Sequence, residues 1–289
     1  MQRRAFFAAA AATALAASAP AFAQATKTSR IKQGLWKINF GPKPALDFDQ
    51  MCAAAARLGA RGFDVIPPDD WPTLRKHGLD PLMVGPGKTD YLTGLIHPEA
   101  HDQVYAGISD QVDLCSRNNV RRIGLTAGQR RGMAYSTAAD NAVAICKRLA
   151  PRLEAGGVTL VIENVNDRRA DPDLSRQDMV FGHWDWGLEV VQRVGSPNVK
   201  LLCDIYHLQI MDGDVTTRIR RDIGQIGHIH VAGVPARKEI DGRQELNYRM
   251  IAQTIADSGY DGYVCHEWRT TPGSDPLKDI AEAMAILNV

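Results

Sequence analysis

VTLVIEN, residues 158–164, is a short apolar run that ends in an acidic residue, Glu163. Three later runs repeat the pattern with a metal-ligand type of residue near the end: Asp204 in VKLLCDIYH (199–207), His230 in IGHIHVAG (226–233) and Glu267 in GYVCHEW (262–268). Runs of this length, rich in Val, Ile and Leu, are typical of buried parallel strands. The carboxyl ends of parallel strands meet at one edge of a sheet, so we expect these four side chains to lie together.

Working outward from these runs, strand patterns alternate with helical patterns along most of the chain. Strands are expected near Leu35–Phe40, Gly62–Ile66, Pro81–Val84, Arg122–Leu125, Thr159–Glu163, Val199–Asp204, His228–Ala232 and Gly262–Glu267. Helices are expected at Leu46–Leu58, His101–Asn118, Thr137–Ala155, Gly187–Val194, Val215–Asp222, Tyr248–Ser258 and Pro276–Leu287. The alternation predicts an α/β fold, a single (β/α)8 barrel over residues 24–289. A doubly wound open sheet is the alternative, but it gathers residues from four consecutive strands around one centre less naturally.

The first residues have the pattern of an export signal. Arg3 and Arg4 precede an Ala-rich apolar stretch, and Ala21-Phe22-Ala23 has the small-x-small form of a cleavage site. The paired arginines resemble the twin-arginine signal of proteins that are exported folded; ordinary secretion and a membrane anchor are the alternatives. We expect residues 1–23 to be a leader that is removed. The protein would then be periplasmic or otherwise exported, and it would have no stable membrane anchor after cleavage.

Net charge bears on the class of binding partner, and cysteine content bears on disulfide bonding. The net charge of the 289-residue chain is +1, which gives no global attraction to nucleic acid. Its five cysteines have no CxxC spacing and are odd in number, which argues against a full disulfide framework in an exported protein. We therefore expect a small-molecule substrate and mostly buried thiols.

Three carboxylates and one imidazole at a single sheet edge form a donor set for one divalent cation. Oxygen ligands with one nitrogen suit Mn²⁺, which we expect here, or Mg²⁺ or Co²⁺. Taken alone, each acid has a simpler explanation as a helix N-cap or a surface charge. Strand alternation places His228 on the same face as His230 and one layer deeper, where it would hydrogen-bond a ligand or satisfy the core.

A resemblance to a known family is carried by VGSPNVKLLCDIYHLQIMDGD (194–214), IGHIHVAGVPARKEIDGRQELNY (226–248), DSGYDGYVCHEW (257–268) and GARGFDVIPPDDWPTLRKHGL (59–79). These segments resemble exported members of the hydroxypyruvate isomerase group of xylose isomerase-like TIM barrels. The resemblance implies that Glu163, Asp204, His230 and Glu267 bind the metal, that Glu163 and Glu267 are also the acid–base pair, and that His207 and Arg237 contact substrate. His230 is a departure, because some hydroxypyruvate isomerases have Gln there while ketose 3-epimerases have His.

Other residues are candidates for the substrate wall. Trp36 and Lys37 lie on the first expected strand, and one of them should face the cavity. His183 follows the long polar loop after the fifth strand, beside Trp184 and Trp186, although aromatic residues there also fit plain packing. Asp64 could reach substrate from the second strand, or form a hydrogen bond within the barrel rim.

The pattern predicts a metal-dependent isomerase or epimerase of a sugar or small hydroxy-carbonyl compound. Its mechanism would be enediolate proton transfer between the two glutamates. Two alternatives remain, a metal-dependent phosphodiesterase or endonuclease on the same barrel and a sugar-binding barrel without catalysis. Relatives of this kind often form dimers or tetramers, so a homo-oligomer is also compatible with the resemblance.

Overall fold

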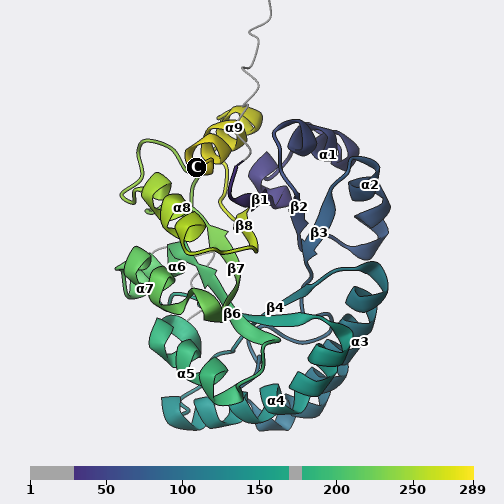
Figure 1. Cartoon of the computed structure of the whole chain (residues 1–289), viewed down its shortest axis with the longest axis vertical. Coiled ribbons are helices and arrows are strands. Elements are labelled where there is room, and N and C mark those ends of the chain that lie inside the picture. The colour runs from purple at the N-terminus through teal and green to yellow at the C-terminus, as the bar shows by residue number, and fades with distance from the viewer. Residues whose placement is uncertain (1–28, 169–177) are drawn as a thin grey trace, which may run out of the picture.

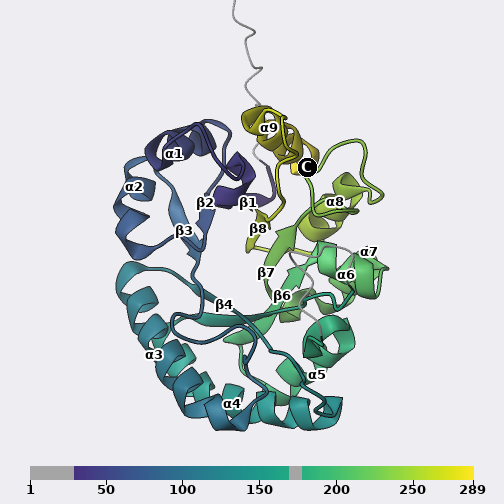
Figure 2. The same cartoon turned by 180° about the vertical axis from the view of Figure 1, so that it is seen from behind.

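The computed structural model describes residues 29–168 and 178–289, and the leader expected at residues 1–23 lies outside them. Parallel strands occupy the middle of the molecule, and helices lie around them (Figure 1). The same ring of helices is visible from behind (Figure 2). The strands are β1 (Lys32–Gly34), β2 (Gly62–Asp64), β3 (Asp80–Met83), β4 (Arg122–Thr126), β5 (Thr159–Glu163), β6 (Val199–Asp204), β7 (Ile226–Val231) and β8 (Tyr263–His266).

The eight strands form a closed barrel. Six of them are hydrogen-bonded in the order β1-β8-β7-β6-β5-β4, and β2 pairs with β3. The two groups are joined by parallel bridges between Leu35 and Phe63 and between Val84 and Ile123. A backbone hydrogen bond is present at each of these two junctions: Asp64 N donates to Leu35 O at 2.9 Å, and Gly124 N donates to Val84 O at 2.8 Å. Each strand therefore neighbours the next in sequence, and β8 neighbours β1, as the (β/α)8 expectation requires.

The helices cover the outside of the barrel and agree closely with the expected positions. They are α1 (Phe48–Arg57), α2 (Trp71–Lys76), α3 (His101–Asn118), α4 (Tyr135–Gly156), α5 (Trp184–Val194), α6 (Ile205–Met211), α7 (Val215–Asp222), α8 (Tyr248–Asp257) and α9 (Pro276–Leu287). The sequence pattern missed α2 and α6, which are short. In the described ranges, no helix has the length and apolar character needed to cross a bilayer.

The first strand is the clearest error in the expected pattern. The structure places β1 at Lys32–Gly34 and a 3-10 helix at Lys37–Phe40, where the sequence predicted a strand over Leu35–Phe40. Asn39 explains the turn, because its Oδ1 accepts from the Trp36 N–H at 2.8 Å and its Nδ2 donates to Trp268 O at 2.9 Å. Asn39 is fully buried, so the local turn satisfies a side chain that a strand would leave without partners.

The five cysteines are free and buried, in agreement with the expectation of mostly buried thiols. Cys203 packs in the main apolar cluster, on the side of β6 that faces the helices. His266 also turns away from the cavity, donating from Nε2 to Gln33 at 2.9 Å and accepting at Nδ1 from the Trp268 indole at 3.0 Å.

Candidate active site

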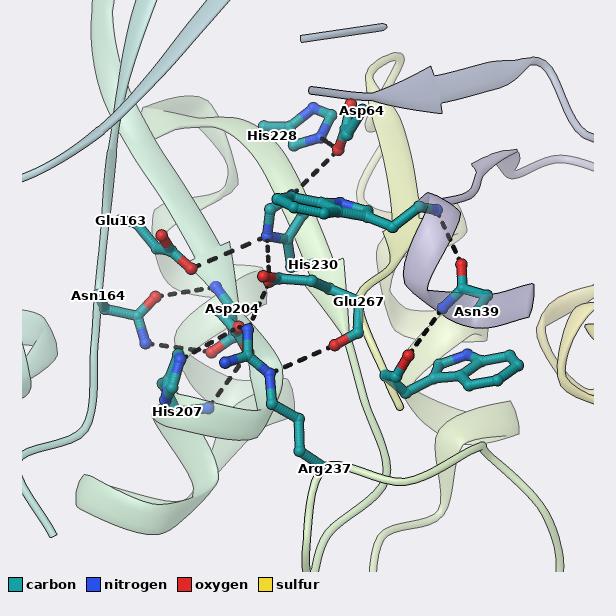
Figure 3. Close-up of polar contacts among 12 residues, drawn as sticks. Asn39, Asp64, Glu163, Asn164, Asp204, His207, His228, His230, Arg237 and Glu267 are labelled. Carbon is teal, nitrogen blue, oxygen red and sulfur yellow. Dashed lines mark hydrogen bonds and ion pairs between the residues drawn. The ribbon is translucent and has the colours of Figure 1, made fainter. Parts of the chain in front are cut away.

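Consecutive parallel strands bring the four predicted ligand residues to one end of the barrel (Figure 3). Glu163 ends β5, Asp204 ends β6, His230 lies near the end of β7 and Glu267 directly follows β8. Asp204 and His230 are direct neighbours in the β6–β7 register. One ligand atom from each of the four side chains lies within 4.8 Å of the others. The strand-end pattern in the sequence thus gives a compact group of donors in space.

Asn164 fixes the end of β6. Its Oδ1 accepts from the Asp204 N–H at 2.8 Å, and its Nδ2 donates to the Asp204 carbonyl at 3.1 Å. The two bonds tie the residue after β5 to the last residue of β6. The backbone that carries Asp204 is therefore held from the neighbouring strand.

The two oxygens of Asp204 have different surroundings. Its Oδ1 accepts from the His207 N–H at 3.2 Å and caps α6, which begins at the next residue. Its Oδ2 faces the site, 3.3 Å from Arg237 Nη2 and 3.5 Å from His207 Nε2. The N-cap is thus made by one oxygen of the carboxylate, and the other oxygen faces the candidate metal site.

The donor group fits a divalent cation. His230 Nδ1 lies 2.8 Å from Glu267 Oε2 and 3.9 Å from Glu163 Oε1. Both His230 Nδ1 and Glu267 Oε2 are buried, and Glu267 Oε2 is also ion-paired with Arg237 Nη2 at 2.6 Å. Oxygen and nitrogen donors that converge in this way are typical of a metal site. The four side chains form a possible site for a hard or borderline cation.

The carboxylates of the site lie beside two cationic groups. Arg237 Nη2 is 2.6 Å from Glu267 Oε2 and 3.3 Å from Asp204 Oδ2. Burial would lower the pKa of His230, but Glu267, Asp64 and Glu163 outweigh it and raise that pKa well above its usual range. Burial, together with the nearby Glu267 and Glu163 charges, raises the pKa of Asp204 although Arg237 opposes this shift. Burial would also raise the pKa of Glu267, but Arg237 and His230 outweigh it and hold that pKa well below its usual range. The charge state of each carboxylate is thus set by burial and by the cationic groups beside it.

A cavity of about 310 Å³ opens onto these donors. His207 and Arg237 line it, together with Trp36, whose indole meets the His230 ring edge-on at a centroid distance of 5.7 Å. His207 Nδ1 lies 2.6 Å from Asn166 Nδ2, which can only donate, so Asn166 orients this imidazole. Apolar residues also line the cavity, among them Val65, Met83, Val165 and Leu202.

Two other predicted substrate residues lie outside the lining of this cavity. Lys37 sits in the 3-10 helix, where its Nζ pairs with Asp70 at 2.7 Å and lies 4.0 Å from the centre of the Phe48 ring. His183 precedes α5 and pairs with Asp212 at 2.7 Å, with 59% of its side chain exposed. Of the two residues proposed on the first strand, Trp36 is the one that faces the cavity, because the chain turns after it.

Sequence reasoning missed several residues around the donors. Thr126 ends β4 and lines the cavity, so the strand-end rule would have found it had hydroxyl residues been included. Tyr91 lines the cavity from the loop after β3, which carries no local signal for that position. Asp64 was not missed, because the sequence indicated that it reaches substrate or forms a hydrogen bond within the barrel; the structure shows hydrogen-bond contacts with His228 and His230.

Comparisons with known proteins agree with this architecture. A family model described as a xylose isomerase-like TIM barrel matches residues 52–288. A 2-oxo-tetronate isomerase of Cupriavidus necator is 41% identical over 121 residues, which are 42% of this chain and 44% of that protein. A putative hydroxypyruvate isomerase of Danio rerio is 34% identical over 155 residues, or 54% of each chain. The matches thus span about half the length of these curated relatives.

Among solved structures, an AP endonuclease of family 2 from Brucella melitensis has a similar fold. The TM-score is 0.73 with 23% sequence identity, covering 88% of this chain and 97% of the other. At this identity the similarity establishes the barrel fold alone.

Proposed function

The chain belongs to the xylose isomerase-like TIM barrel family, and on that premise we propose that it is a metal-dependent isomerase or epimerase. The substrate would be a sugar or a small hydroxy-carbonyl compound. The observation that carries the proposal is the pair Glu163 and Glu267, which flank His230 Nδ1 at 3.9 and 2.8 Å and face one cavity. The names of the curated relatives, which are isomerases, support the same reaction class.

The two glutamates supply the acid–base chemistry. Glu267 is held ionised by Arg237 and His230, so it can accept a proton from the carbon beside a carbonyl. Glu163, at the end of β5, faces the same donor group and can return one. Return to the adjacent carbon of the enediolate gives isomerisation, whereas return to the opposite face of the same carbon gives epimerisation.

A divalent cation held by Glu163, Asp204, His230 and Glu267, which we propose is Mn²⁺ rather than Mg²⁺ or Co²⁺, would stabilise negative charge on the substrate oxygens. Each glutamate has two oxygens, so binding a cation leaves one oxygen to exchange a proton. His207 and Arg237 would hold substrate oxygens by hydrogen bonds, and Trp36 would cover one face of the substrate. The apolar walls exclude water from the reacting carbon.

Turnover of a substrate panel tests the proposal. The Mn²⁺-loaded protein would be incubated with ketoses, aldoses and short keto acids, and products would be identified by NMR. We expect conversion of at least one compound, lost on chelation and reduced by at least 100-fold in Glu163→Gln, because one proton-transfer group is then missing. Glu189→Gln, an exposed residue of α5 paired with Arg193, is the matched control.

A panel without conversion, in protein that hydrolyses phosphoesters instead, would contradict the isomerase proposal and support the endonuclease alternative. Tight sugar binding without conversion would support the binding-protein alternative.

We also propose that the protein is exported, since the paired arginines precede an Ala-rich stretch and a small-x-small site. Cell fractionation of the native chain should find it outside the cytoplasm. Replacing Arg3→Lys and Arg4→Lys together should retain it inside if the twin-arginine route is used. Cytoplasmic native protein would contradict the proposal.

A further inference from the structure

A second polar group lies behind the ligand residues, deeper in the barrel. Asp64, on β2, reaches across to two histidines of β7 (Figure 3). Its Oδ2 lies 2.8 Å from His228 Nε2 and 3.1 Å from His230 Nε2. All three side chains are at most 2% exposed. One carboxylate oxygen thus joins His228 to His230, a residue of the proposed metal site.

The direction of these bonds fixes the chemistry of His230. An ionised carboxylate only accepts hydrogen bonds, so the contacting Nε2 of each histidine must carry the proton. Because Nε2 of His230 faces Asp64, its other nitrogen, Nδ1, faces Glu267 and Glu163. With Nε2–H held by Asp64, Nδ1 is the nitrogen that would give up its proton and offer a lone pair when a cation binds.

The ring of His230 is also restrained from its sides. The Trp36 indole meets it edge-on at 5.7 Å, and the His228 ring lies perpendicular to it at 5.1 Å. These ring contacts limit the tilt of the ring, but they do not choose between its two nitrogens. The hydrogen bond to Asp64 makes that choice.

We propose that Asp64 is a positioning residue that holds His230 with Nε2–H toward the barrel interior and Nδ1 toward the cation. His228 takes part by donating the second bond to the same Oδ2, which keeps the Asp64 carboxylate in place. The inference rests on the proposed function only in requiring that a cation binds, and not on the identity of the substrate.

A different reading would make Asp64, His228 and His230 a second metal site, since their ligand atoms also lie within 4.8 Å of one another. The distances of 2.8 and 3.1 Å are those of ordinary N–H···O hydrogen bonds and leave Asp64 Oδ2 already shared by two donors. The hydrogen-bonded arrangement therefore accounts for the contacts without an ion. Counting the bound ions separates the two readings.

Calorimetric titration of the metal-free full chain with Mn²⁺ tests the proposal. We expect one ion per wild-type chain and an affinity 10- to 100-fold weaker in Asp64→Asn, the usual effect of removing a carboxylate behind a histidine ligand. Asp222→Asn is the matched control. It removes another buried carboxylate, which accepts from the Trp184 indole at 2.7 Å on the helix layer, and should leave Mn²⁺ affinity unchanged within about twofold.

A second measurement needs no variant at residue 64. Nitrogen-15 NMR of the Zn²⁺-loaded wild type, with His230 assigned by comparison with His230→Gln, should show the metal on Nδ1 and the proton on Nε2. The proposal would be overturned by metal on Nε2, by wild-type affinity in Asp64→Asn, or by two Mn²⁺ ions per chain. Tight Mn²⁺ binding without any turnover would count against the proposed function and leave the role of Asp64 intact.

Discussion

At the scale of single residues, the site depends on how a few buried charges are shared. Arg237 is 6% exposed and is the partner of both Glu267 and Asp204. Removing one partner from a buried ion pair leaves the other charge uncompensated, which is more damaging than losing a surface pair. A bound cation would supply the missing positive charge. The stability of the metal-free protein should therefore depend on Arg237 more than that of the loaded protein does.

We expect Arg237→Ala to lower the free energy of unfolding of the metal-free protein by about 3 kcal/mol. The loss should be smaller when Mn²⁺ is present, because the ion compensates the same carboxylates. Urea titration with and without Mn²⁺ measures the difference. Arg193→Ala, which breaks exposed pairs with Asp140 and Glu189, should change stability by less than about 1 kcal/mol under both conditions. Equal losses for Arg237→Ala with and without Mn²⁺ would contradict the compensation.

The sequence identified single site residues best when the residue stands at the end of its own apolar run. Glu163, Asp204, His230 and Glu267 could be proposed because each ends its own apolar run. The partners of Asp64 could not be named, because its contacts join β2 to β7 across the barrel, and Tyr91 could not be placed, because it lies in the loop after β3. Such contacts depend on barrel closure and not on a local pattern.

At the scale of the elements, β2 is held close to β3 by a glycine. A Cβ added at Gly62 would lie 1.8 Å from the backbone oxygen of Asp80, and backbone cannot move aside as a side chain can. Gly62 and Asp80 are partners in the β2–β3 register, and Asp64 follows two residues later. The small residue therefore sets the position of the strand that carries Asp64.

We predict that Gly62→Ala destabilises the fold by about 3 kcal/mol, at the upper end of the range for overpacking. Gly224→Ala is the control, because no described atom lies within 4 Å of the added Cβ and its φ is not positive. Thermal unfolding followed by circular dichroism compares the two variants. A Gly62→Ala protein as stable as wild type would show that β2 and β3 are not in tight contact.

Element positions were predictable wherever periodicity was strong. The sequence placed α3, α7 and α9 at the observed bounds, and β5 and β6 likewise. It misplaced the first strand because Trp36 and Asn39 make a local turn that side-chain hydrogen bonding decides, and such bonding has no periodicity. The short helix α6 was missed because Asp204 reads as a strand end and its N-cap role depends on the turn that follows.

At the scale of the whole molecule, the barrel buries its five cysteines separately, without a disulfide among the described residues. Burial raises the pKa of Cys52 to about 11 and the pKa values of Cys115 and Cys146 to about 12. The thiolate is the reactive form, so native thiols should be inert near neutral pH.

The folded protein at pH 8 should therefore react with almost no thiol reagent, and the protein unfolded in guanidinium without reductant should show five thiols per chain. Colorimetric thiol titration measures both states. Three thiols in the unfolded protein would reveal a disulfide and contradict the arrangement.

Solvent exchange at the reacting carbon tests the central claim, that Glu163 and Glu267 transfer a proton beside a carbonyl. The Mn²⁺-loaded protein would be incubated in heavy water with the compound that it converts, or with the whole panel of ketoses, aldoses and keto acids. We predict deuterium on the carbon next to the carbonyl with the wild type, and incorporation reduced by at least 100-fold in Glu267→Gln. Incorporation by Glu267→Gln at the wild-type rate, or conversion of substrate by the wild type with no deuterium and no internal proton transfer, would contradict the account.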